Sequence, residues 1–394
     1  MNSKMSLTYI ANARFPTEKA HGLQIAKTIE ALTRKHINVN LVIPKRRVFE
    51  KLSPGEFYDL SCEIKPIYLP CIDWFFLYKP FPRLGRFLYA LETITFLFSV
   101  TIFGLIHLPA TLFTRDPYLF VLLSFVRKNL FLELHTFPKT TAGKAVLRQI
   151  LKRANGIVVT NRFLLKKVES EGVAEEKILV APNGADLSLS EKMIPKLTAR
   201  QQLGLPRNQH IVLYLGNFYV SKGVYVLLEA ANNLSKNVKV VLVGGSEADR
   251  NIEPLKSVIV KNSLTQVTLI GFQERRRIPT YLSAADVCVL PNIVTDEESE
   301  FFTTPMKMLD YMAAKRPIVA SDLPALREIL GDESAVFVRP NDPQALAEGI
   351  LRVLKDSIKA NSRAKLAYFL AEGLSWDNRA RRIKMFIGKS ITHA

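Results

Sequence analysis

The sequence predicts an α/β fold with two Rossmann-like domains, each built on a parallel sheet. The main observation is that short apolar runs alternate with longer segments of helical periodicity along the whole chain. The length of 394 residues, the second observation, is enough for two domains that each have a hydrophobic core. The third is the composition, because 48% hydrophobic and 23% charged residues are ordinary for a globular protein.

Thirteen apolar runs predict the strands, and a polar stretch divides them into two groups. The first group comprises Leu7–Ala11, Val39–Ile43, Ile64–Leu69, Thr111–Phe113, Phe131–Leu134, Ile157–Val159 and Ile178–Val180. The second group comprises Ile211–Leu215, Val238–Val243, Val267–Ile270, Val287–Leu290, Ile318–Ala320 and Val336–Val338. Between them, the polar stretch Ser188–Asn208 is the natural linker. We therefore expect an N-terminal domain over residues 1–190 and a second domain over residues 191–374.

The segment 304–330, TPMKMLDYMAAKRPIVASDLPALREIL, has the clearest functional pattern. Pro305 suits the first turn of a helix, and Thr303 or Thr304 suits its N-cap. Asp310 is the one carboxylate in the body of this helix. Because a helix N-terminus favours an anion and a carboxylate can accept hydrogen bonds from ribose hydroxyls, the pattern predicts a nucleotide-sugar site.

This segment resembles the donor-site signature of the retaining glycosyltransferases of family 4. It is most similar to the subgroup that reads S-P-x-K-L-x-E-Y-M-A-x-x-x-P-x-V-A-S-D, in which Lys307 matches the Lys. The usual pattern has two Glu residues separated by seven positions. Asp310 stands at the second position, Phe302 falls on the first, and Glu300 lies two residues earlier.

The resemblance implies the GT-B fold, in which two Rossmann-like domains face each other across a cleft. The nucleotide-sugar donor then binds the second domain, and the final helix crosses back to the first. We therefore assign residues 375–394 to the N-terminal domain. At the start of the donor helix, the expected contacts come from Thr303, Thr304, Lys307 and Asp310.

The start of the second domain extends the expected donor site. The family has an Arg directly after the Gly that matches Gly216, and a Lys five positions later, both on the donor diphosphate. Lys222 fits the second position, whereas Asn217 replaces the Arg. Either another cation substitutes for that Arg or donor turnover is slow; without the resemblance, Lys222 would be an ordinary loop lysine. The candidates for the substitute are Arg275, Arg276 and Lys307.

Two further strand ends resemble family positions that hold the base and the ribose. One is Gly244-Gly245-Ser246, after the strand Val238–Val243, and the other is Gly271-Phe272-Gln273. We expect Gly244, Gly271 and Phe272 to contact the donor, partly through backbone groups. By itself, each of these segments is only a loop.

In the first domain, the segment ANARFPTEKAHGL follows the first strand and opens a helix. A Gly at such a turn lets the backbone approach a phosphate closely, which makes Gly22 a candidate. The resemblance implies that this loop closes on the donor phosphates or the acceptor. Lys19, His21 and Gln24 are then further candidates, although Lys19 could equally be a solvated loop charge.

His135 closes the strand Phe131–Leu134, at the carboxyl end where open α/β sheets bind ligands. The resemblance implies that it holds a sugar hydroxyl or a phosphate oxygen, and a hydrogen-bonded structural His is the alternative. Arg115 and Asp116, at the end of the preceding strand, should line the cleft unless they form an ordinary salt bridge. Asn183-Gly184 favours a tight turn and resembles the family's P-N-G-x-D.

The chemistry is expected to need no metal ion, because no H-E-x-x-H, Cys/His cluster or D-x-D pair is present. Cations and helix dipoles would then stabilise the diphosphate leaving group. The residues assigned to catalysis are His135, Lys222 and Asp310. The resemblance implies front-face attack by the acceptor hydroxyl, deprotonated by a donor phosphate oxygen.

The net charge of +18 is unevenly distributed: residues 1–200 hold 29 Lys and Arg against 16 Asp and Glu. An electropositive half suits an anionic membrane surface or an anionic substrate, and a merely soluble basic face is the alternative. We expect no nucleic-acid partner, because no zinc-finger spacing or aromatic RNA-binding signature is present. Three cysteines without a spaced pattern and an N-terminus without a separate secretory signal favour the cytoplasm.

The apolar stretch Phe87–Ile106 contains one charge, Glu92, and is long enough to span a bilayer. A span would split the N-terminal sheet across the membrane, because a strand that the fold requires follows at once. A buried helix is one alternative. Another is a helix lying in the headgroup region, helped by Trp74, Phe75 and Phe76.

These observations predict a retaining glycosyltransferase that acts in cell-envelope polysaccharide or glycolipid assembly, at the inner face of a bacterial membrane. It would transfer a sugar from a nucleoside diphosphate to a glycan or lipid-linked acceptor. A nucleotide-sugar epimerase or hydrolase of the same fold is one alternative. A non-catalytic sugar-nucleotide-binding protein is the other, suggested by Asn217 and Phe302.

Overall fold

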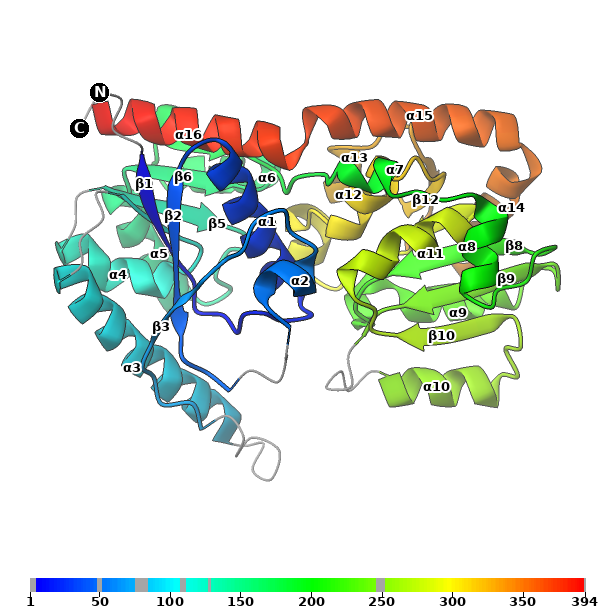
Figure 1. The fold of residues 1–394 in the computed structure, drawn as a ribbon, viewed down its shortest axis with the longest axis horizontal. Coiled ribbons are helices and arrows are strands. Elements are labelled where there is room, and N and C mark those ends of the chain that lie inside the picture. Colours follow the sequence, from blue (N-terminus) through cyan, green and yellow to red (C-terminus); the bar gives the residue numbers. More distant parts are fainter. Residues whose placement is uncertain are drawn as a thin grey trace. The chain divides into compact units, whose positions relative to one another are not determined.

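The computed structural model describes residues 5–47, 52–74, 84–106, 111–126, 129–245 and 252–392, so the predicted roles of Phe75, Phe76 and Ser246 lie outside it. The chain forms two compact units (Figure 1). The N-terminal unit comprises Met1–Pro182 and Arg379–Ala394, and the C-terminal unit comprises Asn183–Asn378. Each unit has its own parallel sheet flanked by helices, which confirms the predicted fold class.

The N-terminal unit contains a seven-stranded sheet with the order β3-β2-β1-β4-β5-β6-β7. All its neighbouring strands are parallel, and the order reverses between β1 and β4, where open α/β sheets bind ligands. The strands are β1 (Ser6–Ile10), β2 (Asn38–Pro44), β3 (Ile67–Leu69), β4 (Leu112–Thr114), β5 (Leu130–Leu134), β6 (Gly156–Val159) and β7 (Ile178–Val180).

The helices of this unit include α1 (Ala20–Arg34), α2 (Pro54–Tyr58), α3 (Gly85–Ile106), α4 (Pro117–Val126), α5 (Thr141–Arg153) and α6 (Arg162–Glu169). The last helix, α16 (Trp376–Thr392), belongs to it from Arg379 onward. There Phe386 packs against Phe131 of β5, with ring centroids 6.1 Å apart. This aromatic contact attaches the end of the chain to the N-terminal sheet.

The C-terminal unit contains a six-stranded parallel sheet with the order β10-β9-β8-β11-β12-β13. The strands are β8 (His210–Leu215), β9 (Val238–Val243), β10 (Val267–Gly271), β11 (Val287–Leu290), β12 (Ile318–Ser321) and β13 (Val336–Val338). Each of the thirteen predicted strands is therefore present, with ends that differ by at most three residues.

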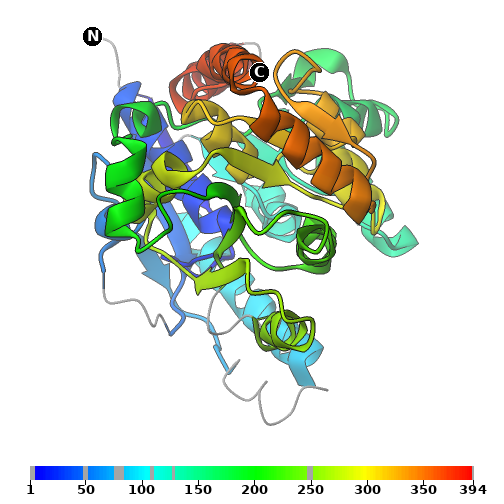
Figure 2. The same ribbon diagram turned by 90° about the vertical axis from the view of Figure 1, so that its right-hand side faces the viewer.

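Helices cover both faces of this sheet, as Figure 2 shows. Alternate residues of β8 point to opposite faces: Leu213 packs with α11 (Ile278–Ala284), α12 (Met306–Ala313) and α15 (Ser357–Gly373), and Tyr214 with α9 (Val224–Ala231) and α14 (Pro343–Lys355). The unit also contains α7 (Ser188–Glu191), α8 (Lys196–Gln202), α10 (Ile252–Lys261) and α13 (Pro324–Arg327). Leu189 of α7 and Ala199 of α8 belong to the same hydrophobic core as Leu213. The prediction that Ser188–Asn208 is a linker is therefore wrong, because this segment is folded into the C-terminal unit.

Helix α3 is only partly covered by the rest of the N-terminal unit. By length and composition it could cross a membrane, and 22% of its apolar segment is buried inside the protein. Phe96 is fully buried, whereas Phe98 is 61% exposed. Its one carboxylate, Glu92, is buried and pairs with Arg46 at 2.6 Å. The prediction of an entirely buried helix is therefore wrong, because one narrow stripe suffices to pack α3 on the unit.

Candidate functional site

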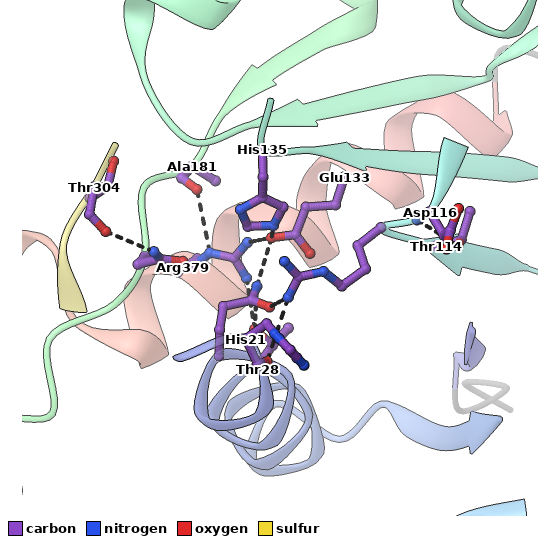
Figure 3. A network of polar contacts seen from close by, with 12 residues as sticks. His21, Thr28, Thr114, Asp116, Glu133, His135, Ala181, Thr304 and Arg379 are labelled. Carbon is purple, nitrogen blue, oxygen red and sulfur yellow. Dashed lines mark hydrogen bonds and ion pairs between the residues drawn. The ribbon is translucent and has the colours of Figure 1, made fainter. Parts of the chain in front are cut away.

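Polar side chains of the N-terminal unit converge on Glu133, a fully buried residue of β5 (Figure 3). Its carboxylate accepts hydrogen bonds from Tyr9 Oη at 3.2 Å, from Gln24 Nε2 at 2.8 Å and from Arg379 Nη2. Burial alone would raise the pKa of Glu133, but the charge of Arg379 lowers that pKa below its usual value, so the carboxyl is ionised. These four residues, Glu133, Tyr9, Gln24 and Arg379, are called the Glu133 network below.

Arg379 connects this network to neighbouring elements. It donates to Thr28 Oγ1 of α1 at 3.1 Å and to the Ala181 carbonyl, after β7, at 3.4 Å. A guanidinium on α16 thus joins a helix and two strand ends of the N-terminal unit. Glu133 and Arg379 are 246 positions apart, and no sequence pattern relates them.

Gln24 and Arg115 extend the network toward the loop after β1. Arg115 Nη1 donates to Gln24 Oε1 at 2.8 Å and to the His21 carbonyl at 3.5 Å. Gln24 is 2% exposed, and both ends of its amide are bound within the fold. The structure therefore uses Gln24 to link Arg115 to Glu133, which is a different role from the predicted contact with a phosphate or acceptor. Asp116 accepts a hydrogen bond from the Tyr118 backbone, at the start of α4.

Two histidines lie beside this network as neutral imidazoles. His135 Nε2 is 3.1 Å from Glu133 Oε1, and its side chain is 21% exposed. Burial, followed by the charge of Arg115, lowers the pKa of His135. The same two causes lower the pKa of His21 from 6.5 to about 3. Neutral imidazoles can exchange hydrogen bonds with hydroxyl groups, which is compatible with the sugar-binding role predicted for His135.

The glycine of the loop after β1 is required for packing. A Cβ atom on Gly22 would lie 2.2 Å from Tyr58 Oη and 2.6 Å from the Thr17 side chain. The need for glycine is thus explained without a phosphate. Lys19 is the exposed N-cap of α1 and makes no side-chain capping hydrogen bond.

In the C-terminal unit, the ends of three neighbouring strands bring together predicted donor-binding glycines. Gly216 N donates to the last carbonyl of β9 at 2.9 Å, and Gly244 N donates to the Gly271 carbonyl at 2.8 Å. A Cβ atom on Gly244, which has φ +135°, would lie 2.2 Å from Gly216 O. Only glycine allows so close an approach at that φ. Phe272 directly follows Gly271 and is 37% exposed.

Lys307 projects from the first turn of α12 toward Gly216. The residue is 9% exposed, and its Nζ lies 3.7 Å from the centroid of the Tyr214 ring. Among the described residues, this Nζ has no hydrogen-bond partner. A Cβ atom on Gly216 would be 3.6 Å from this Nζ. Burial, and then the charge of Lys222, lowers the pKa of Lys307 well below its usual value. A buried amino group without a partner is costly, so this position calls for an anion.

Lys222 follows β8 on a 3₁₀ turn and is the second cation of this region. Burial lowers the pKa of Lys222, and the carboxylates of Glu298 and Asp296 oppose that shift. Lys222 and Lys307 are called the lysine pair below. Asn217 adds no charge here, and its backbone carbonyl accepts a hydrogen bond from Tyr214 Oη at 2.6 Å.

The predicted cap of the donor helix is wrong. The N-cap of α12 is Pro305, with φ −67° and ψ 124°, and no side chain caps it. Thr303 instead donates to the Glu298 carbonyl at 3.0 Å, because a π-helix over Glu298–Phe302 precedes it. The Thr304 carbonyl accepts from Asn183 Nδ2 at 3.1 Å. The two threonines are therefore held within the C-terminal unit.

Asp310 lies on α12 and is bound by Arg275. Its two oxygens accept from Nη1 and Nη2 of that residue, each at 2.7 Å. Arg275 Nη2 is also 3.8 Å from Asp186, the acidic residue of the segment that resembles P-N-G-x-D. Sequence reasoning named Arg275 only as a possible phosphate ligand and gave Asp186 no role. The pairing links segments 35 and 124 residues from Asp310 and has no local signal.

Comparison with known proteins supports the prediction of a glycosyltransferase. Residues 209–356 match the family described as Glycosyl transferases group 1, so this domain is present in the C-terminal half. A Bacillus subtilis (strain 168) protein named as a teichuronic acid biosynthesis glycosyltransferase is 30% identical over 231 residues. The match covers 57% of this chain and 54% of the relative, so the chain spans about half the length of the relative that it matches.

Solved structures share the whole fold. Sucrose-phosphate synthase from Thermosynechococcus elongatus superposes with a TM-score of 0.77 at 20% identity, over 99% of this chain and 100% of that one. Anabaena Alr3699/HepE in complex with UDP-glucose gives a TM-score of 0.75 at 18% identity, over 99% and 100% of the two chains. At this identity the likeness shows the fold alone.

Proposed function

We propose that the protein is a retaining glycosyltransferase of family 4 that moves a sugar from a nucleoside diphosphate to a glycan or lipid-linked acceptor. The observation that carries this proposal is Lys307 of the lysine pair: it lies beside Gly216, is buried, and its Nζ has no hydrogen-bond partner among the residues that the structure describes. A diphosphate would give both amino groups charged acceptors. The name of the Bacillus subtilis relative supports a role in polysaccharide assembly, and the complex with UDP-glucose supports a nucleotide-sugar donor.

Lys307 is the cation that substitutes for the Arg absent at Asn217. Of the three candidates, Arg275 is bound to Asp310, and Arg276 is largely exposed and paired with Glu274 at 2.6 Å. Lys307 alone of the three combines burial with an amino group that has no hydrogen-bond partner within the described residues. The charge of Lys222 also acts on Lys307 and lowers its pKa further. The donor domain can thus stabilise a diphosphate leaving group without the usual Arg.

The lysine pair contributes most to catalysis when the glycosidic bond breaks. Negative charge then accumulates on the diphosphate, and fixed cations stabilise it more in the transition state than in the ground state. Protein cations are sufficient for this step in the proposed reaction, which uses no metal ion. His135, a neutral imidazole at the end of β5, holds a hydroxyl of the sugar, and the acceptor attacks the face that the diphosphate leaves.

The N-terminal unit contacts an anionic membrane from the cytoplasmic side. On α3, Phe87, Phe98 and Ile106 are each more than 60% exposed. Trp74 is 51% exposed, and the segment that precedes it is attached to α3 by a hydrogen bond from Ser99 Oγ to the Pro70 carbonyl at 2.6 Å. The excess of Lys and Arg in residues 1–200 supplies attraction to anionic lipid, and the apolar face supplies insertion.

Purified full-length protein, incubated with UDP-, ADP- and GDP-glucose, tests the proposed activity. The expected result is a glycoside that forms only when a glycan or lipid-linked acceptor is present and that keeps the anomeric configuration of the donor, measured by NMR. Sugar release or epimerisation without acceptor would instead support an epimerase or hydrolase of the same fold. Saturable nucleotide binding with no turnover on any acceptor would support a non-catalytic binding protein.

A further inference from the structure

We infer that Arg275 and Asp186 form a clamp that fixes Asp310 for the ribose of the nucleotide. This inference rests on the proposed function, because it assigns Asp310 to a nucleoside diphosphate. It concerns three residues of the C-terminal unit: Asp310 on α12, Arg275 on a 3₁₀ turn after β10, and Asp186 after β7. Their side chains are between 10% and 13% exposed.

The contact between Arg275 and Asp310 is bidentate. Nη1 and Nη2 each lie 2.7 Å from one carboxylate oxygen, so the planar guanidinium sets the plane of the carboxylate. Each carboxylate oxygen has two lone pairs, and this pairing uses one on each. One acceptor position therefore stays available on each oxygen, which matches the two vicinal hydroxyls of a ribose.

Asp186 holds the guanidinium from a second direction. Its Oδ2 lies 3.8 Å from Arg275 Nη2, and its Oδ1 accepts a hydrogen bond from Ser188 Oγ at 2.7 Å. An outward movement of Arg275 would break contacts with two carboxylates at once. We therefore expect Arg275 to stay in place when a nucleotide binds.

The charges of the three residues favour a ligand that donates hydrogen bonds. One guanidinium between two carboxylates leaves a net charge of −1, so Asp310 remains a strong acceptor. That charge repels a phosphate and attracts hydroxyl hydrogens. The lysine pair has the opposite charge and the opposite preference, so one nucleoside diphosphate can satisfy both regions.

Isothermal titration calorimetry with full-length protein tests the clamp, using UDP, ADP and GDP and the 2′-deoxy form of whichever binds best. The wild type should bind the ribonucleotide at least about tenfold more tightly than its 2′-deoxy form, because one hydrogen bond to a charged group is lost. Arg275→Ala should weaken ribonucleotide binding about tenfold and reduce the preference to about twofold. Arg275→Lys should fall between, because it keeps the charge but loses the fork. Asp186→Asn should weaken binding about threefold.

Arg276→Ala is the matched control, since Arg276 is adjacent and its side chain is 69% exposed. It should keep wild-type affinity and preference. Tighter nucleotide binding by Arg275→Ala would mean that Arg275 blocks the site, and would overturn the clamp. An unchanged preference in that variant, or no preference in the wild type, would also overturn it while the donor site stands. If the wild type binds none of the three nucleotides, the proposed function and this inference fail together.

Discussion

The Glu133 network and the lysine pair differ in whether a buried charged group has hydrogen-bond partners. Glu133 is fully buried and accepts hydrogen bonds from three side chains, including the charged group of Arg379. Lys307 is almost as buried, and in the part of the chain that the structure describes its amino group has no hydrogen-bond partner. A satisfied buried charge stabilises the fold that contains it, whereas an unsatisfied one costs stability and marks a place where a ligand completes the structure. The contrast therefore separates a structural region from a binding region.

The largest effect should come from removing the charge of Glu133. Glu133→Gln leaves Arg379 buried without its ionic partner, so the free energy of unfolding should fall by about 3–5 kcal/mol, measured by urea denaturation. Glu171→Gln is the control, because it breaks the surface pair with Arg148, whose side chain is 52% exposed, and should cost less than about 1 kcal/mol. Equal decreases in the free energy of unfolding of the two variants would contradict a structural role of the Glu133 network.

Removing a charge from the lysine pair should instead increase the free energy of unfolding. Lys307→Met keeps the length of the side chain and removes a buried cation, so the free energy of unfolding should rise by about 1–2 kcal/mol. The same variant should bind UDP at least about tenfold more weakly, because a charged contact with the diphosphate is lost. Urea denaturation and calorimetry measure the two effects. A less stable variant with unchanged affinity would show that Lys307 is a structural residue.

The pH dependence of that variant gives an independent check. Because the pKa of Lys307 is lower in the folded state than its usual 10.5, the unfolded chain binds the proton more tightly. The wild type should therefore gain stability relative to Lys307→Met as pH rises toward 10.5. A constant difference between the two proteins over that interval would contradict burial of the amino group.

Patterns of apolar residues were sufficient to predict the fold. The thirteen strands are short apolar runs whose flanking segments have helical periodicity, so their positions depend on local sequence. The signature that contains Lys307 and Asp310 also lies within one segment, and the helix it predicts is present as α12. Features that depend on neighbouring residues in the chain were therefore accessible from the sequence.

Pairings between distant segments were not predicted. Glu133 and Arg379 are far apart in the chain, and Arg275 looked like a phosphate ligand until its contact with Asp310 was seen. The cap of α12 was also missed, because the π-helix before it takes the hydroxyl of Thr303. For α3, the residues are apolar on every side, so periodicity gave no indication of which face is covered.

Helix α3 allows a similar comparison between its buried and its exposed apolar side chains. Phe98→Asp with Ile102→Asp changes residues that are 61% and 57% exposed, so the free energy of unfolding should change by less than about 0.5 kcal/mol. Sedimentation with anionic vesicles should show loss of the binding that persists in high salt, because apolar insertion is removed. Ile358→Asp, at a residue of the C-terminal unit that is 82% exposed, should leave vesicle binding unchanged.

Phe96 is unsuitable for the vesicle-binding test, because substitutions there should destabilise the protein. This residue is fully buried, so its truncation should cost about 3–5 kcal/mol by leaving a cavity. A double variant at Phe98 and Ile102 that stays folded and still pellets with vesicles in high salt would exclude α3 as the inserted element. Equal binding to neutral and anionic vesicles would exclude the contribution of the basic residues.

The last expected effect concerns His21, beside the Glu133 network. The pKa of His21 is about 3 in the folded protein, below the usual 6.5. Between these two pH values, the imidazole is protonated in the unfolded chain and neutral in the folded one. Stability should therefore fall as pH decreases below 6.5. His21→Gln cannot take up this proton, and should lose about 2 kcal/mol less than the wild type between pH 7 and pH 5, measured by urea denaturation. Parallel stability curves for His21→Gln and the wild type would show that His21 takes up its proton in the folded protein, and the loop after β1 would then carry a positive charge below pH 6.5.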